Sequence, residues 1–222
     1  MPNTPEPPID LGGMRRPYSA ADDGIREETV AADWLAQFES WLADAVAAGL
    51  PEPNAMTVAT ANASGRPSAR TVLLKQVDRG GFTFYTNYTS RKGIEVAENP
   101  YASLVFGWFA IGRQVLVSGA VERTTRAVTE AYFASRPRES QLGAWASPQS
   151  QIVDSRATLD HALAATEARF AGIDPIPAPP HWGGLLVRPE TVEFWHGRVG
   201  RLHDRLRYRR VEDVWILERL GP

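Results

Sequence analysis

Cysteine is absent from the 222 residues, so no disulfide, thiolate nucleophile or cysteine-based metal site is possible, and no metal is expected. No apolar run approaches the roughly 18 residues that a membrane helix needs. Residues 1–12 lack the basic start and apolar stretch of a signal peptide. The formal net charge of −2 gives no electrostatic footprint for nucleic acid or an anionic membrane. A soluble cytoplasmic protein is therefore expected.

Lysine is also scarce, and its two occurrences are informative. Only Lys75 and Lys92 are lysines among the 24 Lys and Arg residues. A genome composition that favours arginine codons would explain the shortage. Under such a bias, however, a lysine that persists indicates a position where a compact point charge cannot be replaced by arginine's wide planar fork. Both lysines are therefore candidate functional residues.

The hydrophobic pattern predicts one domain over residues 15–222, after a polar and proline-rich segment 1–14 that is expected to be disordered. Apolar residues at three- and four-residue spacing predict a helix at 30–48. Strands are expected at 55–61, 71–77, 81–86, 103–109, 114–123, 184–188 and 191–195, with a final hairpin over 204–219, and shorter helices at 90–98, 125–135 and 155–171. Short strands at such spacing favour a mainly β (α+β) barrel over a βαβ sheet.

The segment 84–93 (Phe-Tyr-Thr-Asn-Tyr-Thr-Ser-Arg-Lys-Gly) predicts an anion site. A strand ends there in hydroxyl-bearing residues, and a helix follows that Thr89 or Ser90 can cap. The start of a helix offers free N–H groups and the positive end of its dipole, and Arg91 and Lys92 add two charges. Arginine and lysine are disfavoured in a first helical turn, so a plain surface helix explains this pattern less well than a phosphate site.

Three further motifs carry charge without being decisive alone. Arg70 and Lys75 lie an odd number of positions apart on a predicted strand, so they face opposite sides unless a bulge intervenes. Tyr132 and Arg136 are four apart on a predicted helix and, with Ser140, could form a second anion site, although arginine near a helix end is also ordinary dipole complementation. In segment 201–205 the alternation predicts Arg201, His203 and Arg205 on one strand face, either binding an anion or solvated.

These segments together resemble the pyridoxamine/pyridoxine 5′-phosphate oxidase family. The order and separation of 70–75, 84–92, 114–117, 132–145, 149–150, 193–195 and 201–205 carry the resemblance, which covers nearly the whole chain from about Arg15 to Pro222. The most specific pieces are Arg-Leu-His-Asp-Arg after Glu-Phe-Trp, and Ser-Arg-Pro-Arg-Glu-Ser-Gln. The resemblance implies a homodimer of split β-barrels with FMN at the subunit interface, and oxidation of pyridoxine or pyridoxamine 5′-phosphate by O2 to pyridoxal 5′-phosphate and H2O2.

The resemblance also implies roles for particular residues. The expected FMN contacts are Arg70, Val72, Leu73, Lys75, Tyr85, Thr86, Arg91, Lys92, Gln114, Gln149, Ser150, Trp195 and Arg205. The expected substrate contacts are Lys75, Tyr132, Arg136 and Ser140 around the phosphate, Arg201 and His203 as the catalytic pair beside the pyridine ring, and Arg15 and Tyr18 in a segment that closes over the substrate.

Two other interpretations stay open. A related flavin oxidase of another biosynthetic pathway, such as the phenazine-forming type, resembles this chain at its C-terminal motif but is not expected to share Lys75 and the Arg136 segment. A non-catalytic flavin- or pyridoxal-phosphate-binding protein would not need the substrate-side set. The chain also departs from the family pattern at His196 and Arg198, beside the expected flavin-binding tryptophan.

Overall fold

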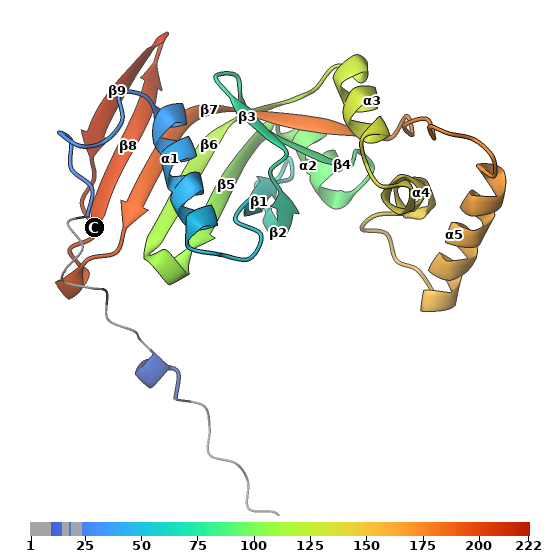
Figure 1. Ribbon diagram of the computed structural model, residues 1–222, viewed down its shortest axis with the longest axis horizontal. Coiled ribbons are helices and arrows are strands. Elements are labelled where there is room, and N and C mark those ends of the chain that lie inside the picture. The colour runs from blue at the N-terminus through green and yellow to red at the C-terminus, as the bar shows by residue number, and fades with distance from the viewer. Residues whose placement is uncertain (1–9, 15–17, 19–23) are drawn as a thin grey trace, which may run out of the picture.

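A curled antiparallel sheet forms the body of the protein, with α1 across one face and α3, α4 and α5 gathered at one end (Figure 1). The structure is a computed structural model that describes residues 10–14, 18 and 24–222. Arg15 and residues 1–9 lie outside the described residues, so the disorder of segment 1–14 and the limits of the domain stay predictions. Among the described residues, no helix is long and apolar enough to cross a membrane.

Nine strands pair in the order β2-β1-β5-β6-β7-β4-β3, with β8 on β7 and β9 on β8. They are β1 (Ala55–Ala61), β2 (Pro67–Leu73), β3 (Gln76–Asp78), β4 (Gly81–Asn87), β5 (Tyr101–Trp108), β6 (Arg113–Arg123), β7 (Trp182–His196), β8 (Asp204–Val211) and β9 (Val214–Arg219). The helices are α1 (Trp34–Ala47), α2 (Arg91–Glu98), α3 (Arg126–Ala134), α4 (Arg138–Ala146) and α5 (Arg156–Arg169), with 3₁₀ turns η1 (Gly12–Met14), η2 (Phe109–Ile111) and η3 (Val199–Arg201).

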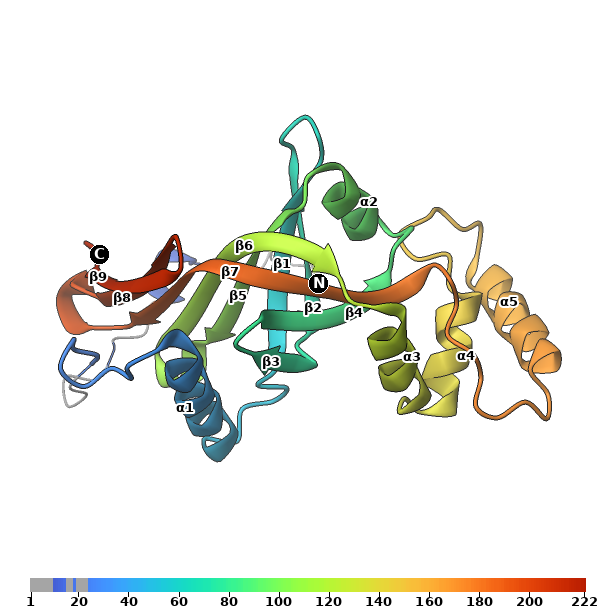
Figure 2. The ribbon, with the colours of Figure 1, turned by 90° about the horizontal axis from the view of Figure 1, so that it is seen from above.

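Strand β7 joins the two halves of the molecule (Figure 2). Along one edge it pairs with β6 from Leu185 to His196. Along the other edge it pairs with β4 through Trp182–Val187 and with β8 through Thr191–His196. One strand therefore connects the helical end of the molecule to the C-terminal hairpin.

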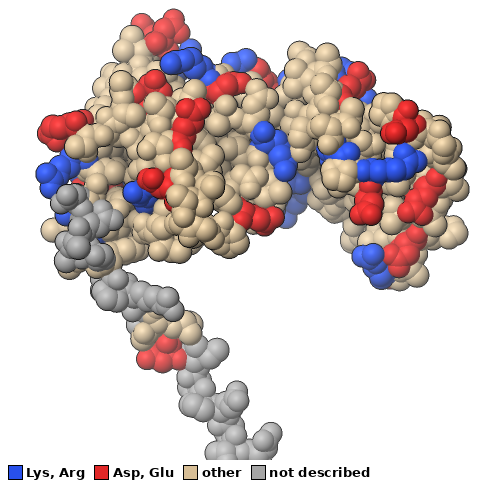
Figure 3. Space-filling model, viewed as in Figure 1, with Lys and Arg blue, Asp and Glu red and all other residues tan. Residues whose placement is uncertain are grey.

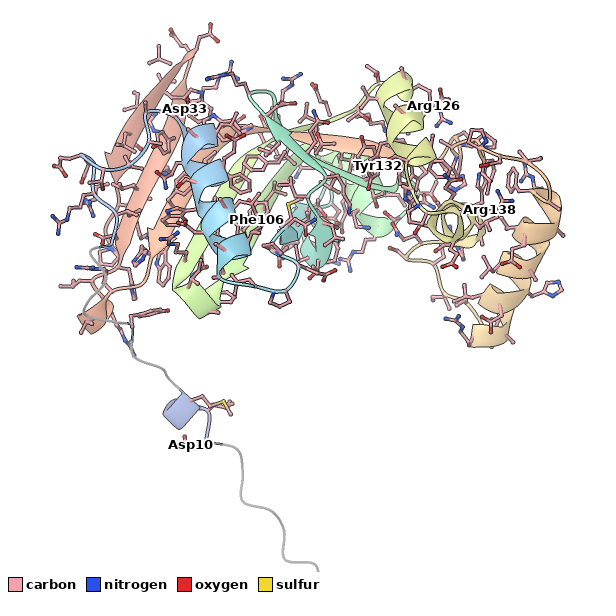
Figure 4. The ribbon with its side chains drawn as sticks, viewed as in Figure 1. Asp10, Asp33, Phe106, Arg126, Tyr132 and Arg138 are labelled. Atoms are coloured by element: carbon pink, nitrogen blue, oxygen red, sulfur yellow. The ribbon has the colours of Figure 1, made fainter. Side chains whose placement is uncertain are left out.

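Helix α1 closes the main core because its apolar stripe faces the sheet. Asp33 caps it by accepting from the Ala36 N–H at 2.9 Å, and Phe106 lies behind it on the sheet (Figure 4). The Phe38 ring sits 5.0 Å from that of Phe106, and Trp41 lies edge-on to another sheet residue, Phe194. The described charged residues seen on the face in Figure 3 mix both signs, which fits the small net charge.

A second, smaller core holds the helical end together. Its buried members come from α3, α4, the loop before β7 and the first residue of β7; they are Phe133, Leu142, Phe170, Ile176, Ala178 and Trp182. Arg138 ties this cluster to the loop by donating to the carbonyls of Ile173 and Phe170, each at 2.8 Å. Because Trp182 begins β7, this core fixes the helices against the sheet.

The sequence prediction of a mainly β protein with a curled, barrel-like sheet is confirmed, and three elements differ in detail. The expected strand 71–77 is two strands, since β2 pairs with β1 while β3 pairs with β4. The expected strands at 184–188 and 191–195 are one, because Pro189 and Glu190 sit in a bulge rather than a turn. Helix α4 was not expected. The hairpin turning at Glu212-Asp213 is confirmed.

Candidate active site

Lys92 lies buried at the start of α2, surrounded by neutral oxygen atoms. Ser90 caps the helix, as one of the two expected caps, by accepting from the Gly93 N–H. The Lys92 ammonium donates to Thr86 Oγ1 and Gln149 Oε1, each at 3.1 Å, and is 3.4 Å from Ser90 Oγ. Among the described residues no carboxylate forms an ion pair with Lys92. A buried cation at a helix start without an anionic partner is suited to a phosphate.

Two arginines converge near Lys92 on one buried carboxylate, that of Glu95. Arg91 Nε donates to Glu95 Oε1 at 2.8 Å, and Arg70 Nη2 lies 3.4 Å from Glu95 Oε2. Thr60 and Ser68 each donate a hydroxyl hydrogen to Glu95 and accept from Arg70. The first turn of α2 therefore gathers three cations, with Glu95 behind them.

The pKa values of this cluster follow from its burial. Desolvation, aided by the nearby charge of Arg70, lowers the pKa of Lys92 from 10.5 to about 8. Burial on its own would raise the pKa of Glu95, but hydrogen bonds from Ser68, Thr60 and Arg91 outweigh it and lower that pKa to about 2. Glu95 is thus a carboxylate at all moderate pH values, while Lys92 titrates near pH 8.

A cavity of about 310 Å³ lies next to this cluster, at the helical end of the sheet. Its lining comes from β4, the α3–α4 connection, α4, the loop after α4 and β7: Asn87, Arg136, Ser140, Gly143, Ala144, Ser147, Gln149 and Trp182. The Arg136 guanidinium stacks on the Trp182 ring at 4.6 Å, and its Nη1 is buried without a hydrogen-bond partner among the described residues. Arg136 therefore brings to the cavity wall a guanidinium whose hydrogen bonds the described residues do not all satisfy, and such a group is suited to an anionic oxygen.

Tyr132, Tyr85 and Trp182 form a stack of rings behind Arg136. Tyr85 and Tyr132 stack at 3.9 Å, and Tyr85 and Trp182 at 5.3 Å. Burial lowers the pKa of Arg136 from its ordinary value and raises that of Tyr132. Arginine still carries its charge at neutral pH. The stack therefore fixes the orientation of a permanent positive charge.

The expectation that Tyr132 and Arg136 share one helix face is wrong. Helix α3, which carries Tyr132, ends at Ala134, and α4 begins at Arg138 (Figure 4). Arg136 therefore lies in the connection between them. Pro137 separates the two helices because the residue before a proline is disfavoured in the helical region. Arg136 and Ser140 still line one cavity, whereas Lys75 is exposed at the break between β2 and β3 and does not line it.

A second group of expected site residues crosses the opposite end of the sheet in register. Gln114 on β6 pairs with Trp195 on β7, which pairs with Arg205 on β8. Side chains in such a row share one face of the sheet. Arg205 also forms a bidentate ion pair with Glu193, at 2.7 and 3.1 Å. The row therefore places side by side the amide of Gln114, the indole of Trp195 and the guanidinium of Arg205, which Glu193 holds in place.

His203 packs beside this row at the rim. Its ring lies 4.6 Å from the Trp195 ring, and Tyr18 lies edge-on to both, at 5.6 and 5.8 Å. The backbone N–H of Arg198 donates to His203 Nδ1 at 3.0 Å. In the neutral ring the hydrogen is consequently on Nε2, which is left as the donor.

The expected strand face formed by Arg201, His203 and Arg205 is wrong. Strand β8 begins only at Asp204; Arg201 ends η3 with φ +65°, and His203 lies between the two elements. Strand alternation does not apply across a turn with left-handed backbone. Asp204 also has charged partners near this turn: its carboxylate binds Arg219 at 2.7 Å and lies 3.5 Å from Arg198 Nε.

The two groups of site residues lie at opposite ends of β7. Thr86 of the Lys92 cluster pairs with Gly183, and Trp195 is twelve residues further along the same strand. At about 3.3 Å per residue this places them about 40 Å apart, farther than one flavin nucleotide reaches. Within one chain, the expected site residues thus form two separate groups. One contains Lys92, Thr86 and Gln149, and the other contains Trp195, Gln114, Arg205 and His203.

Known protein families provide the identification. Residues 42–170 match the family model described as pyridoxamine 5′-phosphate oxidase, and residues 182–222 match the pyridoxine 5′-phosphate oxidase C-terminal dimerisation region. The chain belongs to the pyridoxamine 5′-phosphate oxidase family. The second match covers β7 to β9, the elements that carry Trp195, His203 and Arg205.

Individual members of the family are similar over nearly the full chain. A pyridoxine/pyridoxamine 5′-phosphate oxidase of Salinispora arenicola is 58% identical over 217 residues, which cover 97% of this chain and 96% of the relative. The protein of that name from Acidothermus cellulolyticus is 61% identical over 203 residues, 90% of each chain. Among solved structures, PhzG from Burkholderia lata 383, in complex with tetrahydrophenazine-1-carboxylic acid, has a TM-score of 0.83 at 31% identity, covering 90% of this chain and 98% of that one.

Sequence reasoning missed two residues of the site. Three of the expected FMN contacts differ from one another in burial and in their place in the fold. Glu95 was visible only as an acidic residue four positions after Arg91, and nothing marked Trp182 as the platform for Arg136. Val72 is half-buried against the core and Leu73 ends β2, while Ser150 is exposed with φ +69°.

Among the described residues no cluster of three or more His, Asp or Glu could hold a metal ion.

Proposed function

We propose that this protein is an FMN-dependent oxidase that makes pyridoxal 5′-phosphate. Pyridoxine 5′-phosphate and O2 would give pyridoxal 5′-phosphate and H2O2; pyridoxamine 5′-phosphate, O2 and water would give the same products and ammonia. The observation that carries the proposal is the pair of neighbouring cationic sites at Lys92 and Arg136. They suit two phosphates, one on the cofactor and one on the substrate.

The residues present fit FMN. Lys92, Arg70 and Arg91, with the first turn of α2, would hold its phosphate, and Trp195, Gln114 and Arg205 would meet its ring system. FMN supplies the two-electron acceptor that takes a hydride from the C4′ carbon of the substrate. The chain itself has to bind, orient and desolvate the reactants.

The separation of these two groups supports a homodimer. A single FMN cannot contact Lys92 and Trp195 of one chain across about 40 Å. Two chains arranged about a twofold axis would bring the Lys92 end of each against the Trp195 end of the other. The match of residues 182–222 to a dimerisation region supports this arrangement.

The substrate would be held from both chains. Arg136 and Ser140 would bind its phosphate in the cavity beside Trp182, with the Tyr132 ring in the stack behind Arg136. Lys75, which is exposed and does not line this cavity, would reach the phosphate from outside it. Arg201 and His203 of the other chain would meet the pyridine ring, with His203 donating from Nε2 to a substrate oxygen. Arg201 stays protonated, so it orients the ring rather than accepting a proton.

The direct test is purification followed by assay. We expect a yellow dimer that releases FMN on denaturation and produces H2O2 from pyridoxine 5′-phosphate in proportion to pyridoxal 5′-phosphate. Absorbance, light scattering and peroxide detection measure the three properties. A colourless monomer that takes up no added FMN would contradict the proposal.

The pKa of Lys92 predicts how FMN binding depends on pH. Above about pH 8 the cofactor-free protein should lose the Lys92 charge, so the dissociation constant of FMN should rise several-fold between about pH 7 and pH 9.5. The phosphate itself stays doubly ionised over this range. The Lys92→Met variant should bind FMN more weakly but with little pH dependence. Equal slopes for both proteins would assign the titration to another group.

The same lowered pKa has a consequence for stability, with a defined sign. Between about pH 8 and 10.5 the unfolded chain binds more protons at Lys92 than the folded chain does. The contribution of Lys92 to the free energy of unfolding therefore increases as pH rises through that window in the absence of a bound anion.

Oxidation of a phenazine precursor is the second candidate. The overall similarity to PhzG of Burkholderia lata supports it, at 31% identity. The higher identity to pyridoxine/pyridoxamine 5′-phosphate oxidases and the unpaired Arg136 Nη1 both favour a phosphorylated substrate. Peroxide release with a reduced phenazine carboxylate but not with pyridoxine 5′-phosphate would select this alternative.

A further inference from the structure

Glu95 is an unexpected residue for a phosphate site, because it places a negative charge beneath the cations that would bind the phosphate. Its side chain is 6% exposed and its carboxylate stays ionised. Electrostatics alone would have Glu95 repel a phosphate, or compete with it for Arg70 and Arg91. A role that outweighs this repulsion has to come from what Glu95 holds in place.

Arg70 is held to Glu95 through two hydroxyl bridges. One guanidinium nitrogen, Nη1, donates to Thr60 Oγ1 at 2.7 Å, and the other, Nη2, donates to Ser68 Oγ. Both hydroxyls in turn donate a hydrogen bond to Glu95 Oε2. Because both terminal nitrogens are anchored in this way, the plane of the Arg70 guanidinium is fixed.

Arg91 is restrained by the other carboxylate oxygen. Its side chain is 61% exposed and would otherwise sample many rotamers, but Nε donates to Glu95 Oε1 at 2.8 Å. The two terminal nitrogens of Arg91 form no hydrogen bond with a described residue, so they can donate to a ligand. One carboxylate thus orients two arginines, one from β2 and one from α2.

We propose that Glu95 is a positioning residue, which orients Arg70 and Arg91 so that the cofactor phosphate meets preorganised donors. The inference rests on the proposed binding of FMN at this cluster. Preorganisation favours binding because the side-chain ordering is already complete before the ligand arrives. Glu95 itself touches neither cofactor nor substrate.

The sign of one substitution separates positioning from repulsion. Glu95→Gln removes the negative charge with little change of shape. Positioning predicts that the dissociation constant of FMN rises about tenfold, the effect of losing charge-assisted hydrogen bonds that order the two arginines. Simple electrostatics predicts the opposite, tighter binding. Flavin fluorescence quenching by the cofactor-free proteins measures the constant.

Riboflavin and a matched variant make the test specific. Riboflavin lacks the phosphate, so Glu95→Gln should leave its dissociation constant unchanged. Glu98→Gln makes the same charge change on the same helix, at an exposed residue whose side chain accepts only from the Ala63 N–H among the described residues, and this variant should bind FMN like the wild type. Equal weakening for FMN and riboflavin would show a merely structural role and overturn the inference, as would tighter FMN binding.

A variant with a shorter carboxylate provides a second test in case Glu95→Gln does not fold. Glu95→Asp keeps the charge but withdraws it from the arginines, so FMN binding should weaken while riboflavin binding holds. Unchanged or tighter FMN binding in Glu95→Asp would overturn the inference. Wild-type protein that fails to bind FMN would instead refute the proposed function, and the inference with it.

Discussion

Replacing Arg136 by alanine is expected to raise the KM for pyridoxine 5′-phosphate by about 30-fold or more while leaving FMN affinity nearly unchanged. The reason is that Arg136 lines the cavity beside Trp182 and that its buried Nη1 has no hydrogen-bond partner among the described residues. Removing one partner of a buried charge-assisted contact typically costs about 2–5 kcal/mol, of which 2 kcal/mol already corresponds to about 30-fold. Steady-state kinetics and FMN titration measure the two effects separately.

Arg169→Ala is a suitable control for this experiment. Arg169 also lies over a tryptophan ring, that of Trp145 at 4.6 Å, but it lines no part of the cavity. Its removal should therefore leave KM close to the wild-type value. If Arg136→Ala abolished FMN binding and left KM unaltered, the cofactor and substrate phosphates would have been assigned to the wrong sites.

Replacing Arg201 by leucine is expected to lower kcat/KM by on the order of 100-fold with the dimer and FMN binding retained. Arg201 ends η3, two residues before His203, and small errors in substrate position cost about this much in rate. Kinetics, FMN titration and light scattering provide the measurements. Arg156→Leu, which removes an exposed arginine paired with Asp160 on α5, should behave as wild type.

The neighbours of Arg201 should rank below it. His203→Asn should lose less activity than Arg201→Leu, because an amide can still donate to the substrate. Asp204→Asn should also lose less activity than Arg201→Leu. The Asp204 carboxylate affects the site indirectly, because it lies beside Arg198, whose backbone N–H donates to His203. An indifferent Arg201 beside a highly sensitive Asp204 would remove Arg201 from the substrate site.

Local patterns predicted most of the fold because they are set by short-range chemistry. The helix cap at Ser90, strand β1 and the hairpin at Glu212-Asp213 all follow from residues a few positions apart. The errors arose where distant pairing decides the outcome. The break after β2 exists because the chain changes partner from β1 to β4, and the bulge in β7 exists because β6 continues alongside it.

The parts of the candidate site that lie within one sequence segment could be predicted. The parts that depend on contacts between distant segments could not. The helix start that carries Lys92 lies within the ten consecutive residues 84–93, so the sequence alone indicated an anion site. The support of Arg136 by Trp182 joins residues 46 positions apart, and the Glu95 bridges to Arg70 join two elements. The turn before β8 depends on a left-handed backbone at Arg201, which strand alternation cannot anticipate.

The length of β7 has a genetic consequence in the proposed dimer. Each chain gives its Lys92 end to one site and its Trp195 end to the other, since the two ends lie about 40 Å apart. Two alleles, one damaged at each end, would each encode an inactive homodimer. Mixed in one cell, their products would form heterodimers with one doubly damaged site and one intact site, so the two alleles would complement each other.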